Sequence, residues 1–407
     1  MSDTKIVDIV IPTYNAGNTI DKTLMSIAIQ NIVDKLCVII VDDCSDKENQ
    51  DLYHKYMEMF KPYMRIDYVR LKKNVGPGGA RQTGLDFGNS ELVTFIDADD
   101  VFATSTSLFT LYKDIYNNPT VNYSNSIFQE EVRDNEGNFA GYFDHINDMT
   151  WMFGKIYRRS FLKKYNIQFN NSFSNEDCGF NTLCMLCNDT ENSSLYIDRL
   201  TYCWNFNEKS ITKNNDYSYW GLRGYIYNNI WAVCELEDRL NDESLDLRTD
   251  TTTSRIVNHI INVMVLCYLY YENLLRDGRT TEQINQYLEW CVDYYRDVYI
   301  RYRNLVSQEL FTYCYKLARQ NNERLLENWV ESISVLEFIN KLDSLMLDDL
   351  KLQTANVDNE IKYLPKDITS QDIIHTKTND DLNIYRLSQQ DSEYSNDMRY
   401  KDFFHFS

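Results

Sequence analysis

Short apolar runs alternate with stretches of helical periodicity over the first hundred residues. The runs are continuous and rich in Ile and Val, as in strands that are buried on both faces of a parallel sheet. We expect strands at residues 6–11, 38–41, 66–71 and 92–96, the first of them ended by Pro12. We expect helices at residues 18–30, from the second strand to about residue 60, and at 79–88. This alternation predicts an α/β domain with helices on both faces of its sheet.

The pattern changes at about residue 217, where apolar positions take helical spacing and Gly and Pro become rare. We expect helices at residues 217–239, 253–276, 280–305, 307–320 and 323–347. Residues from about 355 onward are polar and weakly patterned. The predicted organisation is an α/β domain at 1–215, a helical accessory domain at 216–350 and a polar C-terminal extension at 351–407.

Composition excludes several classes of protein. The 407 residues carry a formal net charge of −20, which argues against a general binder of nucleic acid or anionic membranes. No apolar run reaches about 18 residues and the N-terminus has no signal-peptide core, so we expect no membrane span and a cytoplasmic location. The 10 Cys are mostly single, which suits a reducing compartment. The one Cys-x-x-Cys, Cys184 to Cys187, lacks further ligands for zinc and is interpreted as part of a helix.

Polar side chains follow the ends of three predicted strands, where a doubly wound sheet binds its ligands. The first strand leads into residues 12–14 (PTY), whose aromatic ring can stack on a flat base. The second leads into Asp42 and Asp43, ahead of a Ser-Asp pair that can also cap a helix. The fourth leads into residues 97–100 (DADD), whose carboxylates repel one another unless a cation is present. Such oxygen-rich sites suit Mg²⁺ or Mn²⁺ bridged to phosphate oxygens.

These strand ends, taken in order with further landmarks, resemble the family 2 glycosyltransferases. The resemblance covers residues 6–215, about half of the chain. Its landmarks are residues 11–15 (IPTYN), 41–46 (VDDCSD), 74–84 (NVGPGGARQTG), 95–100 (FIDADD) and 176–177 (ED), followed by 209–212 (KSIT). Gln82 stands where the family usually has Asn. The resemblance implies a GT-A (Rossmann-like) nucleotide-sugar-binding domain, here followed by a mainly α-helical domain.

The resemblance implies a donor site for a UDP-sugar at the first two strand ends. Thr13, Tyr14 and Asp42 would hold the nucleotide base, and Asp42 would accept a hydrogen bond from uracil N3. Pro12 and Asp43 would lie beside them in the same donor-binding set.

The resemblance places the metal and the sugar at the fourth strand end. Asp97 and Ala98 would contact the ribose or the sugar, and Asp99 would ligate the Mn²⁺ or Mg²⁺ that bridges the diphosphate. Asp100 would either support the metal ligand from behind or remain a solvated carboxylate. Arg81 would lie near the donor nucleotide, or would form a structural ion pair with a strand-end Asp.

Asp177 is similar to the family's catalytic base, with Glu176 as its rival. Such a base deprotonates an acceptor hydroxyl while the hydroxyl attacks the anomeric carbon, and one displacement inverts the configuration there. A metal would offset the charge that grows on the leaving diphosphate. Residues 175–177 could instead merely begin a helix, since acidic side chains favour helix N-termini.

We expect the acceptor to be a polymer, either a bacterial surface glycan or hydroxymethylated phage DNA. The chain is rich in Asn, Asp, Tyr and Lys, a composition typical of large tailed phages, so a phage origin is a hypothesis and its enzyme would act in the host cytoplasm. DNA would require a cationic track. The most basic segment near the predicted base is 155–164, with Lys155, Arg158, Arg159, Lys163 and Lys164, which could equally be structural. Lys72 and Lys73 could add to such a track.

Two other classes of function stay open. A non-catalytic module that binds nucleotide-sugars or glycans could keep the same fold, since fold does not determine function. A nucleotidyltransferase would need a triphosphate loop rich in Lys and Arg, whereas residues 74–84 offer glycines and one arginine. The aromatic residues of the helical domain could form core, a glycan-binding surface or the interface of a homodimer.

Overall fold

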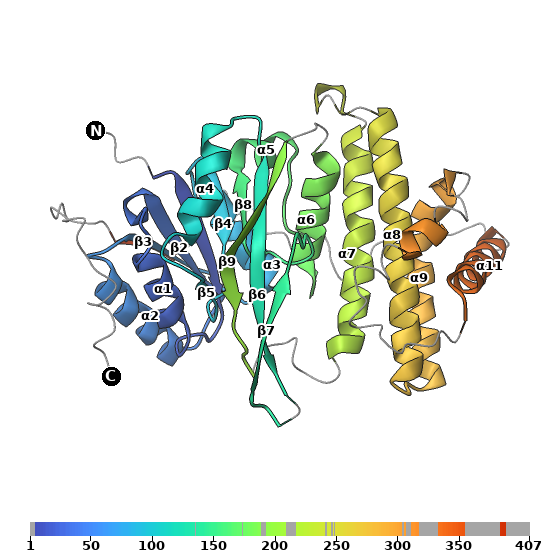
Figure 1. Cartoon of the computed structure of the whole chain (residues 1–407), viewed down its shortest axis with the longest axis horizontal. Helices are drawn as coiled ribbons and strands as arrows, with labels where there is room; N and C mark the ends of the chain where they lie inside the picture. Colours follow the sequence, from blue (N-terminus) through green and yellow to red (C-terminus); the bar gives the residue numbers. More distant parts are fainter. Residues whose placement is uncertain are drawn as a thin grey trace. The chain divides into compact units, whose positions relative to one another are not determined.

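The structure is a computed structural model and divides the chain into two compact units (Figure 1). It describes residues 5–134, 136–172, 174–188, 193–208, 217–240, 242–245, 247, 249–302, 305–306, 311–316, 333–354 and 383–387. The first unit comprises residues 1–184, 190–213 and 373–407, and the second comprises 185–189 and 214–372. The first therefore holds every residue for which the sequence predicted a catalytic or ligand-binding role.

The first unit is built on one mixed sheet with the strand order β10-β3-β2-β1-β4-β8-β6-β9-β5, with β7 paired to β6. The strands are β1 (Val7–Thr13), β2 (Leu36–Asp42), β3 (Arg65–Arg70), β4 (Leu92–Phe95), β5 (Val101–Phe102), β6 (Tyr123–Arg133), β7 (Phe139–His145), β8 (Lys155–Arg158), β9 (Ser194–Trp204) and β10 (Asn383–Leu387). The four strands expected from the apolar runs are β1 to β4, and they pair in parallel. The polar extension also supplies a strand, β10, which lies antiparallel to β3.

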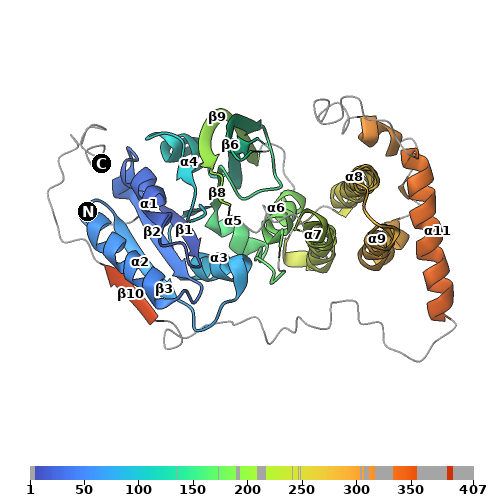
Figure 2. The ribbon, with the colours of Figure 1, turned by 90° about the horizontal axis from the view of Figure 1, so that it is seen from below.

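Helices cover both faces of this sheet, as the alternating pattern predicts. They are α1 (Ile20–Ala28), α2 (Lys47–Phe60), α3 (Gly76–Phe87), α4 (Ser107–Asn117), α5 (Arg159–Lys164) and the start of α6 (Glu176–Cys187). Figure 2 shows α1 and α2 on one side of β1–β3 and α3 on the other. Alternate residues of β1 divide accordingly, because Ile9 and Ile11 join the core of α1, α2 and α4, whereas a Cβ on Gly84 of α3 would meet Val10.

The first strand was expected to end at Pro12, but in the structure it continues to Thr13. β1 pairs with β2 through Pro12 and Thr13, opposite Val41 and Asp42. On its other side the pairing with β4 ends at Val10 opposite Phe95. Pro12 therefore occupies a position where β1 has only one neighbour, and its missing N–H removes no ladder hydrogen bond. The strand consequently carries Thr13 to the edge of the sheet.

Strand directions bring several strand ends to one edge of the sheet. β1, β2 and β4 are parallel, so their carboxyl ends share that edge. β8 is antiparallel to β4, so it starts toward the edge at which β4 ends. Its first residue, Lys155, pairs with Asn125 of β6, which continues in the same direction as β4 to Arg133. β9 is parallel to β6 and therefore also ends there. The edge thus joins the predicted acidic motifs to the segments just before β8 and just after β9.

The second unit contains helices α7 (Tyr217–Leu240), α8 (Thr249–Arg276), α9 (Thr281–Tyr302) and α11 (Val335–Thr354). Three of the expected helices correspond to α7, α8 and α9, and helix is described at 311–316 within the expected 307–320. None of the helices in the described ranges is long and apolar enough to cross a membrane.

Of the helix expected at 323–347, the structure describes residues 333–347, of which 335–347 belong to α11, and residues 323–332 lie outside the described ranges. A capping box starts α11. Ser334 N donates to Glu337 Oε2 at 2.7 Å, and Glu337 N donates to Ser334 Oγ at 3.2 Å. This reciprocal pair satisfies backbone N–H groups that have no partner inside the helix. The Ser-x-x-Glu spacing of this capping box is visible in the sequence, but helical periodicity on both sides of it gives no sign that a helix starts there.

Candidate functional site

The site begins where β1 ends. Thr13 is buried and its hydroxyl donates to the carbonyl of Val41 at 3.1 Å, so its side chain braces the strand end. Tyr14, directly after it, is 56% exposed. Pro12 is half-buried beside them. Of these three predicted donor-binding residues, Tyr14 therefore presents the most accessible surface, an aromatic ring at the edge of the sheet.

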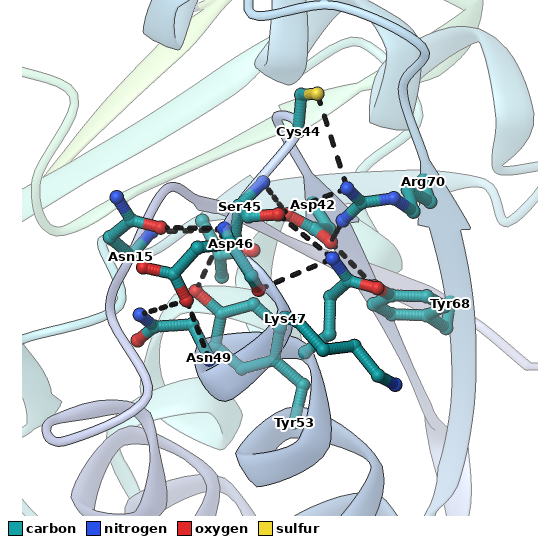
Figure 3. A network of polar contacts seen from close by, with 12 residues as sticks. Asn15, Asp42, Cys44, Ser45, Asp46, Lys47, Asn49, Tyr53, Tyr68 and Arg70 are labelled. Carbon is teal, nitrogen blue, oxygen red and sulfur yellow. Dashed lines mark hydrogen bonds and ion pairs between the residues drawn. The ribbon is translucent and has the colours of Figure 1, made fainter.

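Asp42 ends β2 and sits in a dense polar network (Figure 3). Its carboxylate accepts from the Ser45 backbone N–H at 2.8 Å and from the Tyr68 hydroxyl at 2.6 Å, and it forms an ion pair with Arg70. Asp42 is fully buried, so Arg70 supplies the opposite charge that burial of a carboxylate requires. The network presets the orientation of the carboxylate predicted to bind the nucleotide base.

Tyr68 and Arg70 belong to the site although neither lies in a motif predicted to bind the donor. Their positions on β3 give a signal in the sequence. They stand two residues apart on β3, so they share a face of the sheet, and Arg70 lies in register with Asp42. An arginine that ends an apolar strand next to an aspartate-ended strand is a candidate partner. The expected capping role of Asp46 is confirmed, because its Oδ1 accepts from Asn49 N at the start of α2.

The carboxylate of Asp43 binds backbone N–H groups, and not the predicted site of the nucleotide base. Its two carboxylate oxygens accept from Val75 N at 2.7 Å and from Gly76 N at 2.8 Å. Burial raises the pKa of Asp43 to about 6, although these two hydrogen bonds oppose the shift. Asp43 therefore positions the loop that opens α3, and its link to a donor is indirect.

Arg81 joins two carboxylates that lie far apart in the sequence. One guanidinium nitrogen donates to Asp97 Oδ1 at 2.6 Å, and another forms an ion pair with Glu176. Burial by itself would lower the pKa of Arg81, but the two carboxylates outweigh it and raise the pKa. Of the two roles left open for Arg81, the structure contains the ion pair. A Cβ on Gly78 would meet Glu176 Cγ at 2.8 Å, so a glycine there admits the glutamate.

The acidic motif after β4 is held by the segment after β9. Asp100 is buried and accepts from the Tyr202 hydroxyl at 2.6 Å and from Asn205 N at 2.8 Å. Burial, with Asp99 and Asp97 close by, raises its pKa well above the usual range. Asp100 is therefore an internal brace and not a solvated carboxylate.

Asp99 is held from the same side. Its carbonyl accepts from Asn205 Nδ2 and its Oδ2 accepts from Asn207 Nδ2, each at 2.8 Å. Burial, followed by repulsion from Asp97, raises the pKa of Asp99. Ala98, between the two acids, is buried. The two asparagines were missed by the sequence analysis, and the resembling segment 209–212 that follows them lies outside the described residues.

These acids fit a divalent cation of the kind that bridges to a substrate. Within the described ranges, no three His, Cys, Asp or Glu side chains gather as a complete metal site. Mg²⁺ and Mn²⁺ sites that act on phosphates use only one or two protein carboxylates, with substrate oxygens and water completing the shell. Asp99 and Asp97 supply that number, and a cation between them would relieve their mutual repulsion.

The two candidate bases at the start of α6 differ in their surroundings. Glu176 is engaged by Arg81, whereas Asp177 Oδ1 accepts from the adjacent Cys178 N at 2.8 Å. Burial, with Glu176 next to it, raises the pKa of Asp177 to about 7, against an opposing effect of Arg81. A carboxylate that titrates near neutral pH is suited to general-base chemistry. This comparison favours Asp177 over Glu176.

The basic segment 155–164 does not provide the cationic track that a DNA acceptor would need. Lys155 is buried and donates to the carbonyls of Trp151 at 2.7 Å and Phe153 at 3.1 Å, and burial lowers its pKa to about 8. Arg158 and Arg159 are also buried.

The two arginines brace strand and loop ends. Arg158 Nε donates to the Val121 carbonyl at 2.9 Å, and Arg159 donates to Asp8 at 2.6 Å and to the Ser90 carbonyl at 2.8 Å. Of the predicted cations, Lys163 and Lys164 of this segment are exposed, as are Lys72 and Lys73 outside it. The structural alternative for this segment is therefore correct, because the polar groups it binds are internal.

Comparison with known proteins shows what the first unit is similar to. Residues 8–175 match the model of the family described as glycosyl transferase family 2. An N-acetylglucosaminyltransferase of Bradyrhizobium elkanii is 34% identical over 98 residues, which are 24% of this chain and 53% of that protein. The poly(ribitol-phosphate) beta-N-acetylglucosaminyltransferase TarS of Staphylococcus aureus (strain Mu50 / ATCC 700699) is 31% identical over 100 residues, 24% of this chain and 17% of that protein. The chain thus matches about half or less of these relatives' lengths.

A solved structure supports the fold over a larger part of the chain. S. aureus TarS 1-349 in complex with UDP-GlcNAc aligns with a TM-score of 0.57 and 19% identity, covering 80% of this chain and 93% of that one. The same fragment in complex with UDP aligns with a TM-score of 0.53 and 19% identity, covering 81% and 94%. The predicted GT-A fold followed by a helical region is confirmed. Residues 8–175 are therefore the part of the chain that is similar to glycosyl transferase family 2.

Proposed function

We propose that this protein transfers a sugar from a UDP-sugar to an acceptor hydroxyl, with a divalent metal and with inversion at the anomeric carbon. Support comes from the match to the family 2 model and from one edge of the sheet, where Thr13 and Asp42 end β1 and β2 and Asp97 follows the end of the parallel strand β4. The central observation is the ion-paired Arg81, because it connects Asp97 of the donor motif to Glu176 beside the candidate base.

In the proposed mechanism each motif has one task. Tyr14 stacks on the uracil, and the preset carboxylate of Asp42 accepts from it. Asp99, with Asp97, would hold Mg²⁺ or Mn²⁺, which supplies charge stabilisation to the departing diphosphate. Asp177 takes the proton from the acceptor hydroxyl while its oxygen bonds to the anomeric carbon. The bond between that carbon and the diphosphate breaks in the same step, so UDP leaves and the configuration inverts.

Metal-dependent donor binding tests the first half of this proposal. UDP with Mn²⁺ should raise the melting temperature, since a ligand present at 100 times its Kd adds about 2.7 kcal/mol of stability. Asp99→Ala should lose the metal-dependent part of this shift. The matched control is Asp51→Ala, an exposed acid on α2 whose pair with Lys47 lies on the surface. Equal stabilisation of the wild type by UDP in the presence of EDTA would exclude Asp99 as a metal ligand.

The pH dependence of transfer tests the assignment of the base. Asp177 must be deprotonated to accept a proton, and its pKa is raised to about 7. We therefore expect kcat/KM to rise with pH and to level off above about pH 7. Asp43→Asn should keep this limb, although Asp43 also titrates near pH 6. A limb that persists in the residual activity of Asp177→Asn would show that another group is titrating.

For the acceptor we propose a surface glycan rather than modified DNA. The named relatives include an enzyme of poly(ribitol-phosphate) glycosylation, whereas the buried Arg158 and Arg159 leave the DNA hypothesis without its main cations. A phage origin stays a prediction. A non-catalytic binding module remains the alternative, and hydrolysis or transfer of any UDP-sugar above background would exclude it.

A further inference from the structure

We propose that Trp151 and Trp204 form an aromatic platform that binds a pyranose ring of the acceptor, between the predicted metal ligand and the predicted base. This inference rests on the proposed function and specifies its substrate class, a saccharide rather than an acyclic polyol. Both side chains are partly buried, and their ring centroids lie 5.0 Å apart with the planes at 45°.

The two indoles are the outer members of an aromatic stack. Beneath them Phe153 and Tyr202 are buried, with ring centroids 4.8 Å apart and planes at 18°. Phe153 also lies 5.2 Å from the Trp204 ring and 6.0 Å from the Trp151 ring, parallel to the latter. The inner rings hold the outer ones in place, so the part of each indole that is not buried would lose little conformational entropy when a ligand binds.

Trp204 is adjacent in sequence to a residue that binds the metal motif, and Trp151 forms a hydrogen bond with the helix that carries the predicted base. Trp204 precedes Asn205, whose N–H donates to Asp100 and whose Nδ2 donates to the carbonyl of Asp99. The Trp151 carbonyl accepts at 2.9 Å from Asn181 Nδ2. Asn181 stands four residues after Asp177 on α6, which is about one helical turn. The pair therefore connects the metal motif to the base.

Strand order places this pair on the acceptor side of the site. The nucleotide motifs end β1 and β2, whereas Trp204 ends β9 and Trp151 shortly precedes β8, beyond β4 in the sheet (Figure 1). The acidic motif after β4 lies between the two groups. A donor that places its uracil at β1 and β2 and its diphosphate at Asp99 would direct its anomeric carbon toward β8 and β9.

The chemistry of the platform selects a cyclic sugar. A pyranose has an apolar C–H face that can lie on an aromatic ring while its hydroxyls point outward to polar groups. Two side-chain amides, Asn205 and Asn207, follow Trp204 in the sequence and donate to Asp99. An acyclic polyol has no such flat face and gains less from two fixed rings.

Acceptor kinetics test the platform. With the UDP-sugar that the wild type turns over, we expect Trp204→Ala and Trp151→Ala each to raise the KM for chitotriose or methyl β-glucoside about tenfold, equivalent to about 1.4 kcal/mol. The KM for the UDP-sugar should change less than the KM for the acceptor, since the nucleotide motifs end β1 and β2. Trp204→Tyr should restore most of the acceptor affinity. Tyr196→Ala is the control, an exposed aromatic earlier on the same strand.

The outcomes separate this inference from the proposed function. If the wild type neither hydrolyses nor transfers any UDP-sugar, the proposed function fails, and quenching of tryptophan fluorescence by chitotriose still tests the platform. If transfer occurs and the tryptophan variants keep the wild-type KM for saccharides, the platform is wrong and the indoles only pack. Preference for ribitol phosphate over every saccharide would overturn it as well. Where an alanine variant unfolds, Trp204→Phe and Trp151→Phe preserve packing, and they should retain saccharide affinity.

Discussion

Replacement of Asp177 by asparagine is expected to lower the rate of sugar transfer by roughly 10²-fold or more, the usual contribution of a general base. The amide keeps the shape of the side chain and can still accept from Cys178 N, but it cannot take a proton. Donor binding should persist, because the donor motifs end β1, β2 and β4 while Asp177 lies on α6. Initial rates, together with the Kd for UDP measured by titration, separate the two effects.

The neighbouring acid provides the control for this variant. Glu176→Gln should retain most of the transfer rate, because glutamine can still accept from Arg81 and the base is intact. A transfer rate near that of the wild type for Asp177→Asn, with a large loss for Glu176→Gln, would reverse the assignment. Asp177→Asn should also be more stable than the wild type at pH 8. The raised pKa of Asp177 contributes stability that is present below its unfolded pKa and lost as the pH rises through about 7.

Replacement of Arg81 by methionine is expected to destabilise the N-terminal unit by about 3–5 kcal/mol. It leaves Asp97 and Glu176 without their shared cation. The cost comes mainly from Glu176, because that carboxylate would stay buried without a partner, whereas Asp97 is partly exposed. The loss should appear in the hydrogen exchange of β1 and β4 amides under mild urea, which reports this unit separately from the helical one. Transfer should fall as well, since Asp97 loses its anchor.

Two companion variants show whether the uncompensated charge causes the loss. Arg81→Met combined with Glu176→Gln should recover part of the stability, because one of the two stranded carboxylates becomes neutral. Lys47→Ala removes an exposed pair with Asp51, whose side chains are 78% and 63% exposed, and should cost at most about 1 kcal/mol. An Arg81→Met variant as stable as Lys47→Ala would show that the ion pairs of Arg81 contribute little.

The carboxylates of the site fall into two groups, those at the proposed ligand site and those that hold neighbouring loops. Asp42, Asp97 and Asp99 stand where a donor and its metal would bind. Asp43 holds the start of α3, and Asp100 holds the segment after β9. Of two adjacent acids in one motif, one therefore binds the scaffold and the other is left for the proposed ligand, since successive side chains at a strand end point in different directions. Substitution of Asp43 or Asp100 would disturb the site through its loops.

The sequence by itself determined the parallel part of the sheet and the edge at which ligands would bind. Continuous apolar runs are the signature of strands buried on both faces, and parallel strands necessarily end at a common edge. The acidic motifs could be located because each directly follows such a run, at residues 42–43 and 97–100. The helices α7, α8 and α9 were likewise evident, because helical periodicity is local.

Tertiary structure alone decided which polar side chains meet. Arg81 reaches Glu176 across 95 positions of sequence, and Tyr202 reaches Asp100 across 102. From the sequence, Arg158 and Arg159 could belong to a basic surface segment. In the structure they are buried and donate to the carbonyls of Val121 and Ser90, respectively. Charge in a sequence does not specify burial, because a buried arginine is stable wherever distant backbone and carboxylate oxygens satisfy it.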